Sequence, residues 1–235
     1  MISFYHSPLG HLCRQGMTTR LLNHWQNLQG YSLAGIGYCS PFLEGLAKQG
    51  VVSANIMPAR MGVAHWPPES PNQATITEED SLPLREESIE RLLVCHVLEH
   101  TEDPASTLQE FWRVLAPEGR VMFLVPNRRS LWSRADKTPF GHGRPYSRSQ
   151  MRRLLEDNYF EPLSWTGLFY GPPGTGKTGV RFSRLIDPWG RRLWPGIPGA
   201  WLVEARKRVI GLTGTTQAVK KRSYVFSGAS SPIPS

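Results

Sequence analysis

The sequence lacks long apolar runs. It contains no stretch of about 18 apolar residues, the length that a transmembrane helix needs, so we expect no membrane span. Residues 1–15 lack a basic segment followed by a long apolar run, so we also expect no secretory signal. Cysteine is scarce too: three cysteines without C-x-x-C spacing exclude a disulfide framework and a cysteine zinc site. A cytoplasmic location is therefore the simplest expectation.

Acidic residues are outnumbered by basic ones. The 235 residues include 27 Lys or Arg and 19 Asp or Glu, which gives a formal net charge of +8. This balance permits an anionic partner but does not require one. Hydrophobic residues make up 40% and charged residues 20%, fractions typical of a globular rather than a disordered protein.

Hydrophobic periodicity predicts alternating strands and helices. Apolar residues at helical spacing indicate an N-terminal helical segment over 1–29. Residues 30–210 are expected to form a parallel α/β domain, because strands and helices alternate along them. Residues 211–235, rich in Gly, Ser, Thr and Pro, are expected to form a mobile tail. The expected strands cover 31–37, 51–57, 74–76, 91–96, 120–125, 163–170 and 200–207, and the expected helices 42–48, 103–115 and 149–157.

A glycine turn follows the first expected strand. Gly35-Ile-Gly37 lies between that strand and a helix, where glycines let the backbone approach a nucleotide at the helix N-terminus. The third glycine of the usual pattern is replaced by Cys39. The motif alone therefore fits a nucleotide-like ligand or a plain strand-to-helix turn.

The segment His96-Val-Leu-Glu-His100 matches the zinc-protease pattern H-x-x-E-H. Two histidines four residues apart bind zinc together only on one face of a helix. Here the segment ends a buried strand, and the next helix begins only at Asp103. We therefore predict no metal site and interpret His96 as a residue at a strand end.

The segment Gly171-Pro-Pro-Gly-Thr-Gly-Lys177-Thr178 matches the phosphate-binding loop G-x-x-x-x-G-K-[ST]. That loop requires a strand before it, a helix after it and an acidic residue on a neighbouring strand. Gly179 and Pro188 predict that no continuous helix follows, and the two best buried strands end in His96 and in Pro126 rather than in Asp. An ordinary Gly/Pro loop is favoured, and nucleotide binding through Lys177 is kept as an alternative.

Residues 94–127 carry several further motifs in one order. Val94-Cys-His-Val-Leu-Glu-His100 is followed by Asp103-Pro104, by Leu108-x-Glu-x-x-Arg-Val-Leu-x-Pro-x-Gly119 and, after a strand, by Pro126-Asn127. With the glycine turn, this order resembles the class I S-adenosylmethionine-dependent methyltransferases of type 11. The resemblance implies a Rossmann-like sheet of seven strands, with helices on both faces and an antiparallel last strand. It also implies a closing pair of strands joined by the 171–178 loop.

The resemblance further implies S-adenosylmethionine as the cofactor and assigns residues to it. Gly35 and Gly37 would line its methionine side, and an acid near Leu82-Pro83 would meet the adenine amine. The full set of expected cofactor-binding residues is Gly35, Gly37, Tyr38, Met57, Glu79, Asp80 and His96.

Three positions depart from the family pattern. Leu33 stands where an acid usually precedes the turn, Cys39 replaces the third glycine, and Met57 stands where an acid usually holds the ribose. Residues 45–68 contain no Asp or Glu that could substitute. We therefore expect an atypical cofactor pocket, which segments 37–43 and 57–67 share with a divergent bacterial subgroup of methyltransferase-like proteins. A methyltransferase-fold binding or regulatory protein without catalysis is the alternative.

A basic segment follows the fifth expected strand, on the side where ligands bind in such folds. Residues 128–153 hold eight Arg or Lys and one Asp, Asp136, which we expect to pair with Arg134 or Arg144. We predict that Arg144 recognises an acidic group and that His96 or His142 acts as a base. The acceptor is expected to be an anionic small molecule, RNA is a less favoured partner, and a solvated basic face is the alternative.

Overall fold

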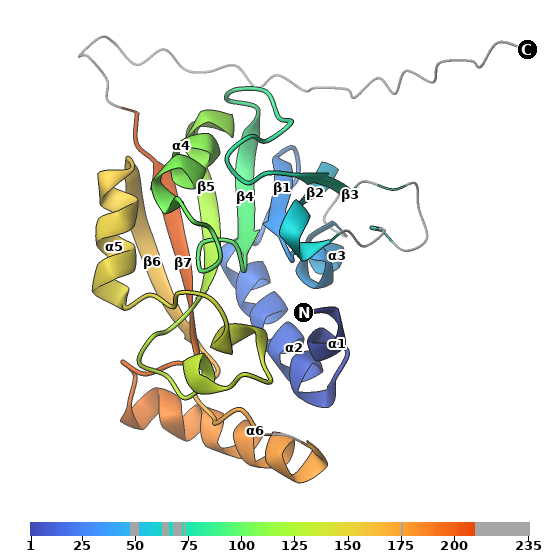
Figure 1. Cartoon of the computed structure of the whole chain (residues 1–235), viewed down its shortest axis with the longest axis vertical. Helices are drawn as coiled ribbons and strands as arrows, with labels where there is room; N and C mark the ends of the chain where they lie inside the picture. Colours follow the sequence, from blue (N-terminus) through green and yellow to red (C-terminus); the bar gives the residue numbers. More distant parts are fainter. Residues whose placement is uncertain (48–51, 63–65, 68–71, 73, 175, 210–235) are drawn as a thin grey trace, which may run out of the picture.

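The computed structural model describes residues 1–47, 52–62, 66–67, 72, 74–174 and 176–209. The expected tail over 211–235 lies outside these residues. The architecture is a seven-stranded sheet in the order β3-β2-β1-β4-β5-β7-β6 (Figure 1). The strands are β1 (Ser32–Gly37), β2 (Val52–Pro58), β3 (Ala74–Thr77), β4 (Ile89–Cys95), β5 (Leu115–Pro126), β6 (Phe160–Leu168) and β7 (Ala200–Lys207).

The sheet confirms the predicted topology. Strands β1 to β5 pair in parallel, whereas β7 is antiparallel to both of its neighbours, β5 and β6. The chain starts at β1, moves outward to β3 and then crosses back to β4 beside β1. The strand order therefore reverses between β1 and β4, and a crevice opens there at the carboxyl ends of these strands.

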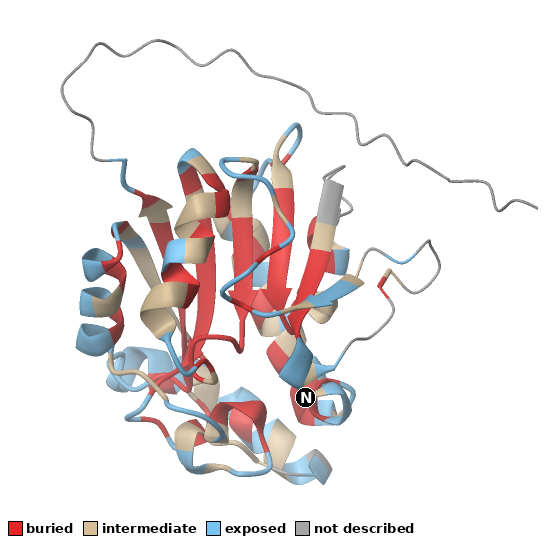
Figure 2. Ribbon diagram, turned by 45° about the horizontal axis from the view of Figure 1, so that its top comes forward, coloured by how far each residue is buried: buried red, intermediate tan, exposed pale blue. Residues whose placement is uncertain are grey.

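Helices cover both faces of the sheet, and the buried residues form the layer between them (Figures 1 and 2). Leu33 and Ala34 are adjacent in β1 yet belong to opposite core clusters, because successive strand residues point to opposite faces. Helices α1 (Ile2–Tyr5), α2 (Pro8–His24) and α3 (Ser40–Ala47) pack on the Leu33 face. Helices α4 (Pro104–Val114) and α5 (Arg148–Asp157) pack on the other face.

Helix starts follow local capping chemistry. The Asp103 carboxylate accepts hydrogen bonds from the backbone N–H groups of Ala105 and Ser106, and Pro104 occupies the first turn of α4. Ser147 and Gln150 form a reciprocal capping box at the start of α5. Both helices begin within one residue of the predicted starts. Short 3-10 helices occur at Ala59–Met61, Trp132–Arg134 and Pro139–Gly141.

The prediction that no continuous helix follows the 171–178 segment is wrong. Helix α6 (Gly176–Leu193) extends over 18 residues and contains Pro188. Gly179 and Gly190 mark close approaches rather than breaks: a Cβ at Gly190 would lie 2.6 Å from the Cβ of Tyr170. The Asp187 carboxylate accepts the Tyr170 N–H at 2.6 Å and ties the helix to the end of β6. Strands β6 and β7 are therefore joined through a helix and not by a loop alone.

Candidate functional site

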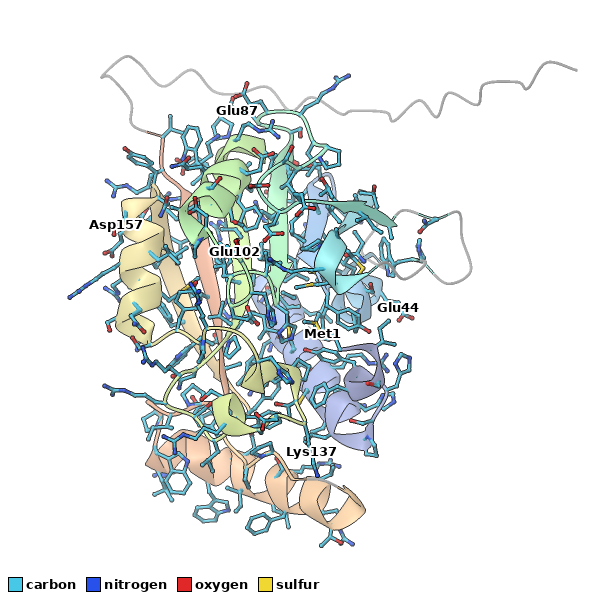
Figure 3. All side chains as sticks on the ribbon, in the orientation of Figure 1. Met1, Glu44, Glu87, Glu102, Lys137 and Asp157 are labelled. Carbon is cyan, nitrogen blue, oxygen red and sulfur yellow. The ribbon has the colours of Figure 1, made fainter. Side chains whose placement is uncertain are left out.

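A cleft of about 830 Å³ lies at the carboxyl ends of β1, β2 and β4. Tyr38 follows β1, Arg60 and Met61 follow β2, and His100 follows β4. The N-terminal segment closes the opposite wall, and Figure 3 shows Met1 at this end of the sheet. The cleft occupies the crevice at which the strand order reverses, where open α/β sheets bind their ligands. The wall residues from the N-terminal segment are Met1, Ile2, Ser3 and His6.

Gly35 and Gly37 have different structural roles in the turn. Gly37 has φ +85°, and a Cβ there would lie 2.2 Å from the Cys95 carbonyl oxygen, so only glycine fits. The Tyr38 N–H donates to the same carbonyl at 3.1 Å, which places the Tyr38 ring at the cleft. A Cβ at Gly35 would lie 2.7 Å from Leu43 of α3, so Gly35 permits helix packing. Neither glycine lines the cleft.

On β2 the structure draws attention to a residue that sequence reasoning missed. Met57 and Leu33 are both 1% exposed and belong to the core beneath α2 and α3 rather than to the cleft wall. Asn55 is fully buried, its Nδ2 donates to Ser40 Oγ at 2.8 Å, and its Oδ1 has no partner among the described residues. Residues 45–68 contain no Asp or Glu, but the amide oxygen of Asn55 also accepts hydrogen bonds from hydroxyls.

An ion pair joins the end of β2 to the segment before β4. Glu79 is buried and accepts a hydrogen bond from Arg60, a cleft residue that sequence reasoning also missed. The second carboxylate oxygen of Glu79 is buried and has no partner within the described part of the chain. Asp80 is exposed. Of the two predicted acids, Glu79 is the one that the fold places beside the cleft.

A buried chain of polar side chains crosses the end of β4. His96 is fully buried, its Nδ1 lies 2.9 Å from Glu99 Oε1, and its Nε2 lies 2.7 Å from the Tyr5 hydroxyl. A carboxylate only accepts, so Nδ1–H donates to Glu99, and Nε2 accepts the Tyr5 hydroxyl proton. Both ring nitrogens of His96 are thereby held by hydrogen bonds.

Tyr5 of α1 covers this histidine. Its ring stacks on Tyr38, with centroids 5.3 Å apart and an interplanar angle of 23°, and meets Phe42 edge-on. Burial, with smaller contributions from nearby Cys13 and Cys95, raises the pKa of Tyr5 well above its ordinary value. The hydroxyl therefore keeps its proton as a donor to His96. The N-terminal segment was predicted only as helical, and no local pattern indicates this contact between residues 91 positions apart.

His100 lies on the wall of the cleft. Burial lowers its pKa; His96 and Arg60 lower it further, and Glu99 partly opposes them. Its Nε2 is buried without a partner in the part of the chain that the structure describes. Tyr146 packs against the segment that follows β4. Its hydroxyl donates to the Leu98 carbonyl oxygen at 2.9 Å, and burial raises the pKa of Tyr146 to about 12.

Comparisons with known proteins agree with this architecture. Residues 15–123 match a family model described as "Methyltransferase domain". A "probable S-adenosylmethionine-dependent methyltransferase" of Mycobacterium tuberculosis is 29% identical over 185 residues, which are 76% of this chain and 64% of that protein. The chain thus spans slightly less than two thirds of this curated relative.

Solved structures share the whole fold. An S-adenosylmethionine-dependent methyltransferase from Archaeoglobus fulgidus has a TM-score of 0.59 at 16% identity and covers 83% of this chain and 94% of its own. One from Mesorhizobium loti has a TM-score of 0.55 at 14% identity, covering 83% of this chain and all of its own (100%). The sheet thus has the fold of these methyltransferases, and residues 15–123 are similar to their methyltransferase domain.

The 127–146 loop packs against Glu99 and His100, and His100 lines the cleft. A Cβ at Gly143 would lie 2.4 Å from the Glu99 carbonyl oxygen, and the Arg144 N–H donates to that oxygen at 2.7 Å. His142 and Arg144 are exposed and do not line the cleft. His142 Nε2 lies 2.8 Å from the Asp136 carbonyl oxygen, to which it donates. The functional roles of His142 and Arg144 stay predictions.

The predicted ion pair of Asp136 is wrong. Asp136 is exposed and forms no ion pair with Arg134 or Arg144, all three of which are described. The loop is held instead by packing of aromatic rings. The centroid of the Phe140 ring lies 5.5 Å from that of Trp132 and 5.0 Å from that of His96. Burial of two aromatic rings fixes the loop more strongly than an exposed ion pair could. Asp136 lines a separate cavity of about 560 Å³ between α1 and the start of α6.

The phosphate-loop string lies at the edge of the sheet. It follows β6, the edge strand, whose neighbour β7 is antiparallel. A phosphate loop instead follows a parallel strand that has a metal-holding acid on the strand beside it. The Lys177 side chain lies outside the described residues. The string therefore serves as the start of α6, and nucleotide binding there stays a hypothesis.

Proposed function

We propose that this protein is an S-adenosylmethionine-dependent methyltransferase with an atypical cofactor pocket. The proposal depends chiefly on one observation: the methyltransferase fold opens its cleft at the strand-order reversal, and several buried polar atoms near it have no partner among the residues that the structure describes. The names of the Mycobacterium tuberculosis relative and of the structural neighbours support the same activity. The unpartnered atoms are Asn55 Oδ1, Glu79 Oε2, Glu99 Oε2 and His100 Nε2.

The chemistry of these groups fits the cofactor. Ribose hydroxyls and the adenine amine are donors. The amide oxygen of Asn55 on β2 and a carboxylate oxygen of Glu79 are acceptors that have no partner within the described ranges. Tyr38 offers an aromatic face at the cleft, which suits a positively charged sulfonium. Leu33 supplies no charge to the methionine end, so this end is the atypical part of the pocket.

The bound cofactor supplies an activated methyl group, and the chain's residues orient the acceptor and remove its proton. His96 is the base we assign, because Glu99 holds its Nδ1–H and leaves Nε2 as a proton acceptor. Tyr5 now occupies that acceptor site. Tyr5 and His96 are both buried and neither lines the cleft, so in this proposal a proton reaches His96 Nε2 only by relay through the Tyr5 hydroxyl, which gives its own proton to Nε2 as it takes one from the acceptor. Arg144, exposed at the cleft border, remains our candidate for recognising an anionic acceptor.

Titration calorimetry of the full chain with S-adenosylmethionine, and separately with ATP and Mg²⁺, tests the proposal. We expect S-adenosylmethionine to bind, and Tyr38→Ala to weaken binding by about tenfold through lost apolar contact. Tyr159→Ala, which removes an exposed tyrosine outside the cleft wall, is the matched control. ATP binding alone would favour the Lys177 hypothesis. No binding of either ligand would favour a methyltransferase-fold protein that has lost its cofactor.

A further inference from the structure

Helix α6 carries an exposed apolar stripe. Phe182, Leu185, Trp189 and Leu193 are 55%, 70%, 65% and 62% exposed. Their spacing of three, four and four residues places them on one face of the helix. Trp194 and Ile197, directly after the helix, are exposed as well. Exposed large apolar residues scattered singly are ordinary, but a continuous aromatic and aliphatic stripe marks a contact surface.

The opposite side of α6 is the one that packs on the protein. Val180 contacts the core cluster beneath α2, and Ser183 is buried. Asp187 accepts the Tyr170 N–H and lies 3.6 Å from Arg191. In Figure 1 the helix lies across the end of the molecule beyond the sheet, and in Figure 3 side chains project from its outer side. The stripe is therefore not a misplaced part of the core.

The charges beside the stripe are of one sign. Residues 176–193 contain five Lys or Arg and a single acid, Asp187, which faces inward. Arg181, Arg184 and Arg192 form no ion pair among the described residues. In a symmetric contact between two copies, these arginines would approach their own counterparts. An anionic lipid bilayer offers both partners: its headgroups attract the arginines, and its acyl chains accept the apolar stripe.

We propose that α6 docks this protein on the surface of an anionic membrane, with the stripe among the acyl chains and the arginines at the headgroups. No helix of the described part is long and apolar enough to cross a membrane, so α6 lies on the surface. Docking holds the cleft end of the molecule against the bilayer, because α1, the 127–146 loop and α6 share that end (Figure 1). The proposal is independent of cofactor binding, which the calorimetric titration reports separately.

Co-sedimentation with vesicles tests the proposal on the full chain. We expect binding to vesicles that contain phosphatidylglycerol, weaker binding to pure phosphatidylcholine, and loss of binding at high salt. Leu185→Ser with Trp189→Ser should weaken binding at least about tenfold. Arg181→Gln with Arg192→Gln should weaken binding to the anionic vesicles about thirtyfold. Tyr159→Ser and the pair Arg152→Gln with Arg153→Gln are controls, because they change exposed residues outside α6.

A fluorescent label separates insertion from mere attraction. The three native cysteines are buried, so a Leu185→Cys variant is labelled at α6 selectively. We expect a blue shift of an environment-sensitive dye when phosphatidylglycerol vesicles are added. Failure to sediment with these vesicles would overturn the proposal. A dimer that the Leu185→Ser, Trp189→Ser variant converts to a monomer, without vesicle binding, would assign the stripe to a second copy and also overturn it.

Discussion

Removing one hydroxyl, in Tyr5→Phe, tests the buried chain at the end of β4. The Tyr5 hydroxyl lies 2.7 Å from His96 Nε2, and His96 is fully buried, so water cannot replace the lost partner. The phenylalanine ring keeps the stacking on Tyr38 and leaves no cavity. The cost is therefore that of one unsatisfied buried polar atom, and we expect the free energy of unfolding to fall by about 1–3 kcal/mol.

Urea unfolding followed by circular dichroism measures this cost. Tyr38→Phe is the control, because the Tyr38 hydroxyl makes no hydrogen bond within the described part of the chain and the ring lies in the same stack. Its effect should stay within about 0.5 kcal/mol. A double-mutant cycle of Tyr5→Phe with His96→Leu should show that the two costs are not additive. Equal free energies of unfolding for Tyr5→Phe and Tyr38→Phe would refute the reasoning.

Two further predictions concern residues around the same cleft. Gly37→Ala should lower the free energy of unfolding by about 3 kcal/mol or more, because strain at positive φ adds to a clash with the Cys95 carbonyl. Gly30→Ala, with φ +76° and open space around its Cβ, should cost only about 1 kcal/mol, and similar urea midpoints for both variants would contradict this. The pKa of His100 is lowered from 6.5 by burial, so the unfolded chain binds its proton more readily and stability falls as pH drops below that value. In His100→Gln the free energy of unfolding should fall less steeply as the pH drops below 6.5. An unchanged dependence on pH would contradict the role given to His100.

Local sequence patterns determined the elements of the sheet. Short apolar runs bounded by Gly, Pro or Asn predicted β1, β2 and β4 to within two residues at each end, because a buried parallel strand has few polar positions. The capping residue Asp103 predicted the start of α4, because a cap acts on backbone groups only two or three residues away. The fold itself was predicted from its resemblance to a methyltransferase family, which the structure confirms.

The error at α6 shows the limit of local signals. Gly179, Pro188 and Gly190 each weaken a helix, and their sum predicted a loop. The helix forms because packing against Tyr170 and the bond from its N–H to Asp187 offset those costs. Neither contact is visible in a window of neighbouring residues. The apolar stripe and the arginines beside it are encoded in residues 176–193. They fall on one surface only when these residues form a helix.

The sequence by itself determined the succession of strands along the chain, the Gly37 turn and the position of His96 at the end of β4, because each depends on residues that are neighbours in the chain. Only the tertiary structure decided what surrounds them. Tyr5 and His96 are 91 positions apart, and Arg60 and Glu79 are 19 apart. Their partners are chosen by how α1 and the segments after β2 and β3 converge on one end of the sheet. Hydrogen bonds between distant side chains depend on that convergence, and no spacing rule along the chain encodes it.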